Sequence, residues 1–245
     1  MQLYLAAAPE QEGSVTCPLS QRVRAAYRTD GTHLLSSPLP PQLRGGMLLL
    51  SDREAPSLSD PDTLAREVMQ ECLRRNYSAV VLDFESVRDD RFPARMAAWC
   101  SRYKRRLYVP ETFADTAGTS VLVCTAVTGG SLRSHLQQAI ARYGTGRVAL
   151  DLQRLMTDYP LPSSGIGSSL PREEWAKLAA GRPIYFSDEL CARYFTWRSG
   201  SQMHFVLYDD ADTMQRKIAL GDELGIAEGF LMYPEVEDIA EKLMG

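Results

Sequence analysis

Two acidic side chains, Asp83 and Glu85, close the apolar segment Ala79–Glu85 and are separated by one aromatic residue. If this segment is a β-strand, side chains two residues apart share a face, so both carboxylates point the same way as Val81. Two carboxylates this close interact strongly, and one of them should have a raised pKa and carry a proton at neutral pH, as a general acid must. A metal site, a binding site or a merely solvated strand end is the alternative for such a pair.

Further acids follow apolar segments elsewhere in the chain. Glu111 comes directly after Leu107–Pro110, and Asp151 lies in Arg147–Leu152. An acid inside an apolar segment needs a partner or a function, so Asp151 is a candidate for the same site. Glu111 is a candidate too, although the ordinary polarity of surface loops is the stronger explanation for it. Glu235, near the C-terminus, is interpreted as solvated.

Eight short segments rich in Val, Leu and Tyr are nearly continuous in apolarity, which is typical of strands covered on both faces. These predicted strands are Gln2–Ala7, Thr32–Ser36, Met47–Ser51, Ala79–Glu85, Leu107–Pro110, Ser120–Thr125, Arg147–Leu152 and Gly229–Tyr233. Helical patterns fill several gaps, and three of them run from Asp60 to Asn76, from Ser131 to Gly144 and from Asp212 to Gly225.

Eight strands that alternate with helices predict an α/β fold, a single (β/α)8 TIM barrel over residues 1–245, rather than an open doubly wound sheet. In such a barrel Asp83 and Glu85 lie at the C-terminal mouth, where barrel enzymes carry out their chemistry. An insertion of α+β type is predicted over about residues 158–208, between the seventh and eighth strands. It contains a Pro/Gly/Ser loop at Asp158–Ser169, a helix at Pro171–Ala180 and an antiparallel hairpin around Arg198–Gln202.

Composition argues against several classes of protein. The net charge is −4, and the 27 basic and 31 acidic residues are interspersed along the chain. The sequence therefore shows no basic face that would indicate a nucleic-acid partner. The five cysteines are scattered and the three histidines lie far apart, so a structural zinc site is not expected, and the cysteines are interpreted as reduced, buried thiols. The glycines of Gly165–Gly167 do not lead a strand into a helix, so no nucleotide cofactor is expected.

The first ten residues, MQLYLAAAPE, lack a basic region, and their apolar stretch is short. Neither a secretion signal nor a membrane span is therefore expected, and the expected location is the cytoplasm. The sequence leaves the oligomeric state open.

Two parts of the chain resemble glycoside hydrolase family 18, the chitinase family. Leu82–Glu85, after an apolar run that a helix precedes, resembles the end of that family's D-x-x-D-x-D-x-E motif. Tyr208–Asp210, the helical stretch with Lys217, Leu224–Gly225 and the strand Gly229–Tyr233 resemble its closing segment. The resemblance implies a divergent family 18-like barrel, and the predicted hairpin suits the small α+β element that many members carry.

The resemblance also implies a carbohydrate ligand and particular roles for residues. Glu85 would protonate the leaving oxygen of a retaining, substrate-assisted hydrolysis. Asp83 would orient the N-acetyl group, whose carbonyl oxygen attacks the anomeric carbon, and stabilise the oxazolinium intermediate. Tyr233 would replace the usual tryptophan as the floor beneath the sugar. The other candidates for sugar contact are Tyr208, Asp209, Asp151, Glu111 and Trp197.

Some of these candidates have a second explanation. Trp197 lies in the predicted hairpin, where aromatic side chains more often pack across the strands. Asp210 is interpreted as the cap of the following helix, and the role of Asp209 is left open.

The sequence departs from the family motif at three places. Ser78 and Val81 stand where two motif aspartates belong, and Ala126 falls where the family has a polar residue after its sixth strand. Our first hypothesis is a glycoside hydrolase that cleaves N-acetylglucosamine-containing glycans, chitin-like oligomers or peptidoglycan, without a metal. A catalytically impaired carbohydrate-binding barrel is the second. An enzyme that holds a divalent cation between Asp83, Glu85 and Asp151 is the third. The expected location is therefore cytoplasmic or spore-associated, since a cell-wall substrate would fit an intracellular protein with a role in recycling or within a spore, or a protein whose leader has been removed.

Overall fold

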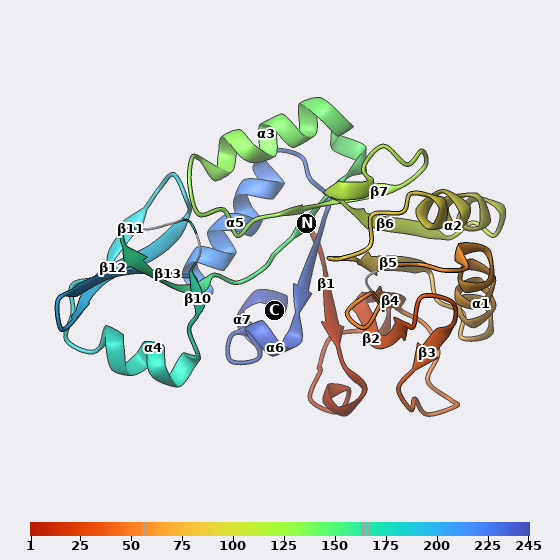
Figure 1. Cartoon of the computed structure of the whole chain (residues 1–245), viewed down its shortest axis with the longest axis horizontal. Helices are drawn as coiled ribbons and strands as arrows, with labels where there is room; N and C mark the ends of the chain where they lie inside the picture. Colours follow the sequence, from red (N-terminus) through yellow and green to blue (C-terminus); the bar gives the residue numbers. More distant parts are fainter. Residues whose placement is uncertain (56, 163–164, 166) are drawn as a thin grey trace.

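Eight parallel strands close into a barrel (Figure 1). The computed structural model describes residues 1–55, 57–162, 165 and 167–245. In barrel order the strands are β1 (Gln2–Ala7), β2 (Arg22–Thr29), β4 (Met47–Ser51), β5 (Ala79–Asp83), β6 (Arg106–Pro110), β7 (Ser120–Cys124), β8 (Val148–Asp151) and β14 (Glu228–Met232). β1 closes the ring, because it pairs in parallel with both β14 and β2. The predicted TIM barrel is therefore confirmed.

The second barrel strand differs from the prediction. We expected it at Thr32–Ser36, but β2 occupies this position, and β3 (Leu34–Ser36) only pairs antiparallel with the outer end of β2. β2 was not predicted because it is not a continuous apolar segment: Arg22 and Arg24 belong to it. Both arginines form ion pairs with Glu12, from the loop that follows β1, so their charges are satisfied only in the folded barrel.

Helices cover the outside of the barrel between strands. They are α1 (Pro61–Arg74), α2 (Arg91–Arg102), α3 (Leu132–Tyr143) and α5 (Ala211–Glu223), and α6 (Tyr233–Val236) and α7 (Ala240–Met244) end the chain. Short polar side chains begin three of them. Asp60 accepts a hydrogen bond from the Thr63 amide at 3.0 Å, and Asp210 accepts one from the Thr213 amide at 2.9 Å. Ser131 caps α3 in the same way.

Side chains alternate along β5 as its period predicts. Val80 and Leu82 pack outward in a cluster with α1 and α2, whereas Ala79 and Val81 fill the barrel interior. The inward parity continues to Asp83, the last residue of β5. The barrel core therefore directs Asp83 toward the C-terminal mouth.

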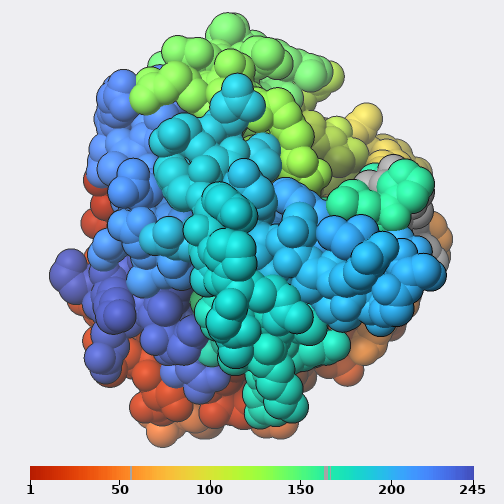
Figure 2. All heavy atoms as spheres, turned by 90° about the vertical axis from the view of Figure 1, so that its left-hand side faces the viewer, coloured from red at the N-terminus to blue at the C-terminus, as the bar shows by residue number. Residues whose placement is uncertain are grey.

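The insertion between β8 and β14 is a five-stranded antiparallel sheet with one helix. Its elements are β9 (Met156–Leu161), β10 (Ser168–Ser169), α4 (Arg172–Ala179), β11 (Tyr185–Ser187), β12 (Ala192–Ser199) and β13 (Gln202–Tyr208). β12 and β13 form the hairpin. Of the predicted loop Asp158–Ser169, positions 163–164 and 166 lie outside the described residues. Figure 2 looks at the molecule from the insertion, which stands in front of the barrel.

A buried ion pair joins the end of the insertion to α5. The Asp209 carboxylate lies 2.6 Å from Lys217 Nζ, and neither side chain is exposed. The same carboxylate accepts hydrogen bonds from the Leu155 amide, before the insertion, and from the Thr213 hydroxyl, both at 2.9 Å. Asp209 thus holds the two ends of the insertion together.

We expect Lys217→Met to lower the free energy of unfolding by about 3–5 kcal/mol, because the Asp209 charge would stay buried without its partner. Urea denaturation measures this loss. Adding Asp209→Asn should restore part of the stability. Lys177→Met, on the exposed face of α4, is the control. Equal stability of the Lys217 and Lys177 variants would contradict the role of the pair.

Candidate active site

A cavity of about 350 Å³ opens at the C-terminal mouth of the barrel. Strand residues with inward parity form its apolar base, among them Val81 and Phe230. Its polar lining comes from many elements and consists of Arg53, Asp83, Glu85, Glu111, Cys124, Asp151, Gln153 and Glu235. Five of these eight side chains are carboxylic acids and Arg53 is a cation, so the lining of the cavity is predominantly acidic.

Asp83 lies half-buried beside the end of β4. Burial raises the pKa of its carboxyl, and the charges of Glu85 and Asp52 raise it further. The Arg53 charge and a hydrogen bond from Ser51 act in the opposite direction. Asp83 is therefore an acid whose charge state depends on its neighbours.

The backbone around Glu85 is fixed by Asp52, a fully buried acid that directly follows β4. The Asp52 carboxylate accepts hydrogen bonds from the amides of Glu85, Ser86 and Val87 at 2.9, 2.8 and 2.6 Å. These bonds hold the turn after β5, so that the exposed Glu85 side chain lines the cavity. Asp52 was not predicted from the sequence, although it is an acid at the end of the apolar segment Met47–Ser51, as Asp151 is in Arg147–Leu152.

Asp151 ends β8 and faces the cavity beside Cys124 and Phe230, its partners on the neighbouring strands. Burial raises the pKa of Asp151 to about 7, with further contributions from the charges of Glu235 and Asp83. Its carboxyl can therefore exchange a proton near neutral pH.

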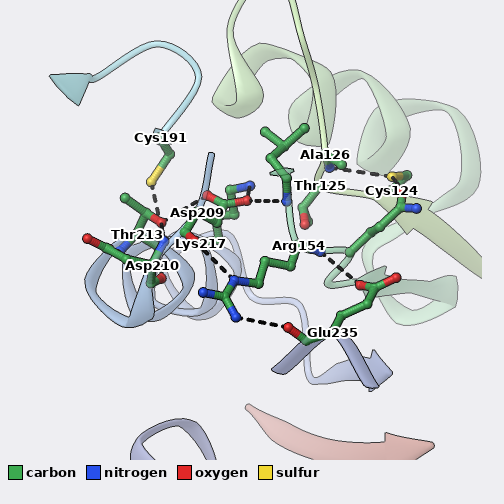
Figure 3. Close-up of polar contacts among 12 residues, drawn as sticks. Cys124, Thr125, Ala126, Arg154, Cys191, Asp209, Asp210, Thr213, Lys217 and Glu235 are labelled. Carbon is green, nitrogen blue, oxygen red and sulfur yellow. Dashed lines mark hydrogen bonds and ion pairs between the residues drawn. The ribbon is translucent and has the colours of Figure 1, made fainter. Parts of the chain in front are cut away.

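The interpretation of Glu235 as a solvated residue was wrong. Because α6 begins directly after β14, it turns Glu235 over the mouth, where the carboxylate accepts a hydrogen bond from the Arg154 amide at 3.0 Å. Figure 3 shows this contact, and also the Arg154 guanidinium between the backbone oxygens of Asp209 and Glu235. Burial raises the pKa of Glu235, whereas the hydrogen bond and charge of Arg154 lower it.

Glu111 lies at the rim of the same cavity, in the short 3-10 turn Glu111–Phe113 after β6. Its side chain is exposed and accepts a hydrogen bond from the Tyr143 hydroxyl at 3.3 Å. The fold thus gathers Asp83, Glu85, Asp151 and Glu111 around one cavity.

Tyr233 lies elsewhere, and the expectation that it forms the floor of the site was wrong. It is buried in an outer cluster with Leu231, because residues of odd number along β14 face outward. The inward side chains of this strand are Phe230 and Met232, and both line the cavity.

Three further candidates also lie away from the cavity. Asp209 is a structural acid in the buried pair with Lys217. Tyr208 is buried in the core of the insertion, with its ring 5.0 Å from that of Trp175 in α4. Trp197 packs against the same core, stacks on His204 at 4.3 Å and donates a hydrogen bond to Asp158. These three side chains were expected to contact sugar. They instead take part in packing and ion pairing within the fold.

Asp210 is the cap of α5, as the sequence indicated. Within the described ranges, no three His, Cys, Asp or Glu side chains are arranged to hold a metal ion. The described helices also include none that is long and apolar enough to cross a membrane.

No protein-family model matches the sequence, and no curated protein matches it. Solved structures do match. The C-terminal domain of a putative chitinase from Desulfitobacterium hafniense DCB-2 has a TM-score of 0.71 at 14% identity, over 99% of this chain and 97% of that one. The spore cortex-lytic enzyme SleL of Bacillus megaterium QM B1551 has a TM-score of 0.64 at 16% identity, over 95% and 70%.

A third similar structure is the chitinase-like agglutinin RobpsCRA from Robinia pseudoacacia, with a TM-score of 0.57 at 13% identity over 98% of both chains. The chain therefore has the chitinase-like (β/α)8 barrel, the fold that the resemblance implied. The sequence identity to these three structures is only 13–16%.

We expect Asp52→Asn to speed amide hydrogen exchange at Glu85, Ser86 and Val87, because an amide oxygen accepts weaker hydrogen bonds than a carboxylate. The free energy of unfolding should fall by roughly 1.5–3 kcal/mol. Exchange mass spectrometry and urea denaturation measure these two effects. Asp62→Asn, at an exposed ion pair on α1, is the matched control. Unchanged exchange after β5 would show that Asp52 does not hold this turn.

Proposed function

We propose that this barrel is a glycoside hydrolase that cleaves N-acetylglucosamine-containing glycans, either chitin-like oligomers or peptidoglycan. The observation that carries the proposal is the pair Asp83 and Glu85, which ends the fourth barrel strand and lines the mouth cavity. The fold supports it, because the chain shares this barrel with a putative chitinase and a spore cortex-lytic enzyme. The same likeness supports a spore-associated place of action.

In the proposed mechanism Glu85 is the general acid that protonates the oxygen of the leaving sugar. The Asp83 carboxylate accepts a hydrogen bond from the N–H of the substrate's N-acetyl group. This bond orients the carbonyl oxygen of the same group for attack on the anomeric carbon. The developing positive charge on the oxazolinium ring lies beside the Asp83 carboxylate, which stabilises it. Water then attacks the anomeric carbon and opens the ring, and Glu85 accepts a proton from this water, which restores its acid form.

A second candidate function is a carbohydrate-binding barrel without turnover. Two observations favour it. Val81 offers no acid beneath Asp83, and Tyr233 is turned away from the mouth, so part of the expected catalytic apparatus is missing. That an agglutinin shares the fold supports this alternative.

We expect Glu85→Gln to lower the rate of hydrolysis by roughly 10²–10⁴-fold, because the amide cannot supply the proton. The assay uses fluorogenic N-acetylglucosamine oligomers and peptidoglycan fragments, with and without a chelator. Glu173→Gln, exposed on α4, is the control and should keep full activity. Hydrolysis should persist in the chelator, since the mechanism needs no metal.

If the wild-type protein binds an N-acetylglucosamine tetramer without releasing product, the binding barrel replaces the hydrolase. If it neither binds nor hydrolyses any of these glycans, both candidate functions are wrong.

A further inference from the structure

Three carboxyl groups at the mouth have unequal surroundings. Asp83 lies near the positive charge of Arg53 and receives a hydrogen bond from Ser51. Glu235 receives the Arg154 amide hydrogen at 3.0 Å and lies near the Arg154 charge. Each of these two acids therefore has groups that stabilise its ionised form.

Asp151 has no such support. No described residue donates a hydrogen bond to its carboxyl group, and the electrostatic influences on it are burial and the charges of Glu235 and Asp83, which all disfavour ionisation. Two fully buried acids, by contrast, do have such support. The Asp52 carboxylate accepts three amide hydrogens, and Asp209 is paired with Lys217.

Among the described residues, no cation is paired with the Asp151 carboxyl group. The nearby Cys124 thiol stays neutral, since burial and the Asp151 charge raise its pKa to about 11, and it donates to Gln153 at 3.3 Å. The charged and titratable groups that surround Asp151, from every element at the mouth, are Arg53 after β4, Asp83 and Glu85 at β5, Glu111 after β6, Cys124 in β7, Arg154 after β8 and Glu235 in α6.

We propose that Asp151 is a positioning acid, which holds the proton that the clustered carboxyl groups share and thereby leaves Asp83 ionised. It compensates for Val81, which stands where the motif has an acid two residues before Asp83. The physical reason is that neighbouring carboxyls cannot all ionise at low cost, so the proton stays where ionisation is least supported. This inference rests on the proposed function, because an ionised Asp83 is needed to accept the N-acetyl N–H.

The proposal predicts how sugar binding depends on pH. Below about pH 7, Asp151 keeps its proton, and the Arg53 charge and the Ser51 hydrogen bond favour the negative charge on Asp83. Above about pH 7, Asp151 ionises, so the protein must take up a proton to regain the state with a neutral Asp151 beside an ionised Asp83 that binds the N-acetyl sugar. The affinity of the wild-type protein for an N-acetylglucosamine tetramer should therefore fall roughly tenfold per pH unit above pH 7.

The test is isothermal titration calorimetry with this tetramer between about pH 5 and 9. Asp151→Asn mimics the neutral acid, so its affinity should stay near the low-pH value of the wild type across the series. Asp151→Ala, which offers no donor, should bind more weakly than Asp151→Asn at every pH. Parallel profiles for the wild type and Asp151→Asn would overturn the proposal.

A readout without sugar separates this inference from the proposed function. In ¹³C NMR of the unliganded protein, one aspartate carboxyl carbon should titrate near pH 7, and this signal should be missing in Asp151→Asn. The Tm difference between variant and wild type should also grow as the pH rises from 3.8 to about 7, and it should stay constant above that range. Within this range the unfolded chain releases the Asp151 proton while the folded state keeps it, so the stability of the wild type falls with rising pH.

The outcomes are distinct. Absence of a carboxyl titration near pH 7 overturns the inference even if the protein hydrolyses glycans. A titration that disappears in Asp151→Asn supports the placement of the proton. If the tetramer binds neither protein, the proposed function fails, and the positioning role for sugar binding fails with it.

Discussion

Closure of the barrel is the constraint on which the site depends. β1 pairs with β14 on one side and β2 on the other, and the first and last barrel strands therefore lie side by side. Packing is close at Gly229 in β14, where an added Cβ would lie 2.8 Å from a side-chain methyl carbon of Leu152 and would force that side chain to move. Because all eight strands are parallel, their carboxyl ends gather at one mouth. Closure thus brings together acids from β5, β8 and α6 that lie far apart in the chain.

The surroundings of each buried acid indicate its role. Asp52 and Asp209 have complete sets of hydrogen-bond or ion-pair partners, and each joins two segments of backbone. Asp151 lies in the cavity with none among the described residues, and it is the acid with the pKa near neutrality. A half-buried acid without partners costs stability, and such an arrangement points to a site rather than to the stability of the fold.

The insertion uses its aromatic side chains for its own core. Trp197 and Tyr208 face α4 together with Phe195, so this small sheet is stabilised by packing against one helix. The ion pair of Asp209 with Lys217 and the contacts of Arg154 then fasten the insertion beside the mouth. The residues that most resembled sugar contacts in the sequence therefore stabilise the element that borders the site.

Local signals in the sequence determined a large part of this protein. The apolar segments predicted the barrel, and Asp60, Ser131 and Asp210 cap helices, because periodicity and capping depend on neighbours within a few residues. The period of two also placed Asp83 at the inward end of β5. These features depend little on distant parts of the chain.

Only the tertiary structure decided the rest. β2 was missed because its arginines need Glu12 from another segment, and Tyr233 was misplaced because one residue of register exchanges the two faces of a strand. Glu235 reaches the mouth through the turn into α6. The pKa of Asp151 depends on burial and on charges from β5 and α6, so the sequence identified this acid as a candidate, whereas the folded barrel set its proton affinity.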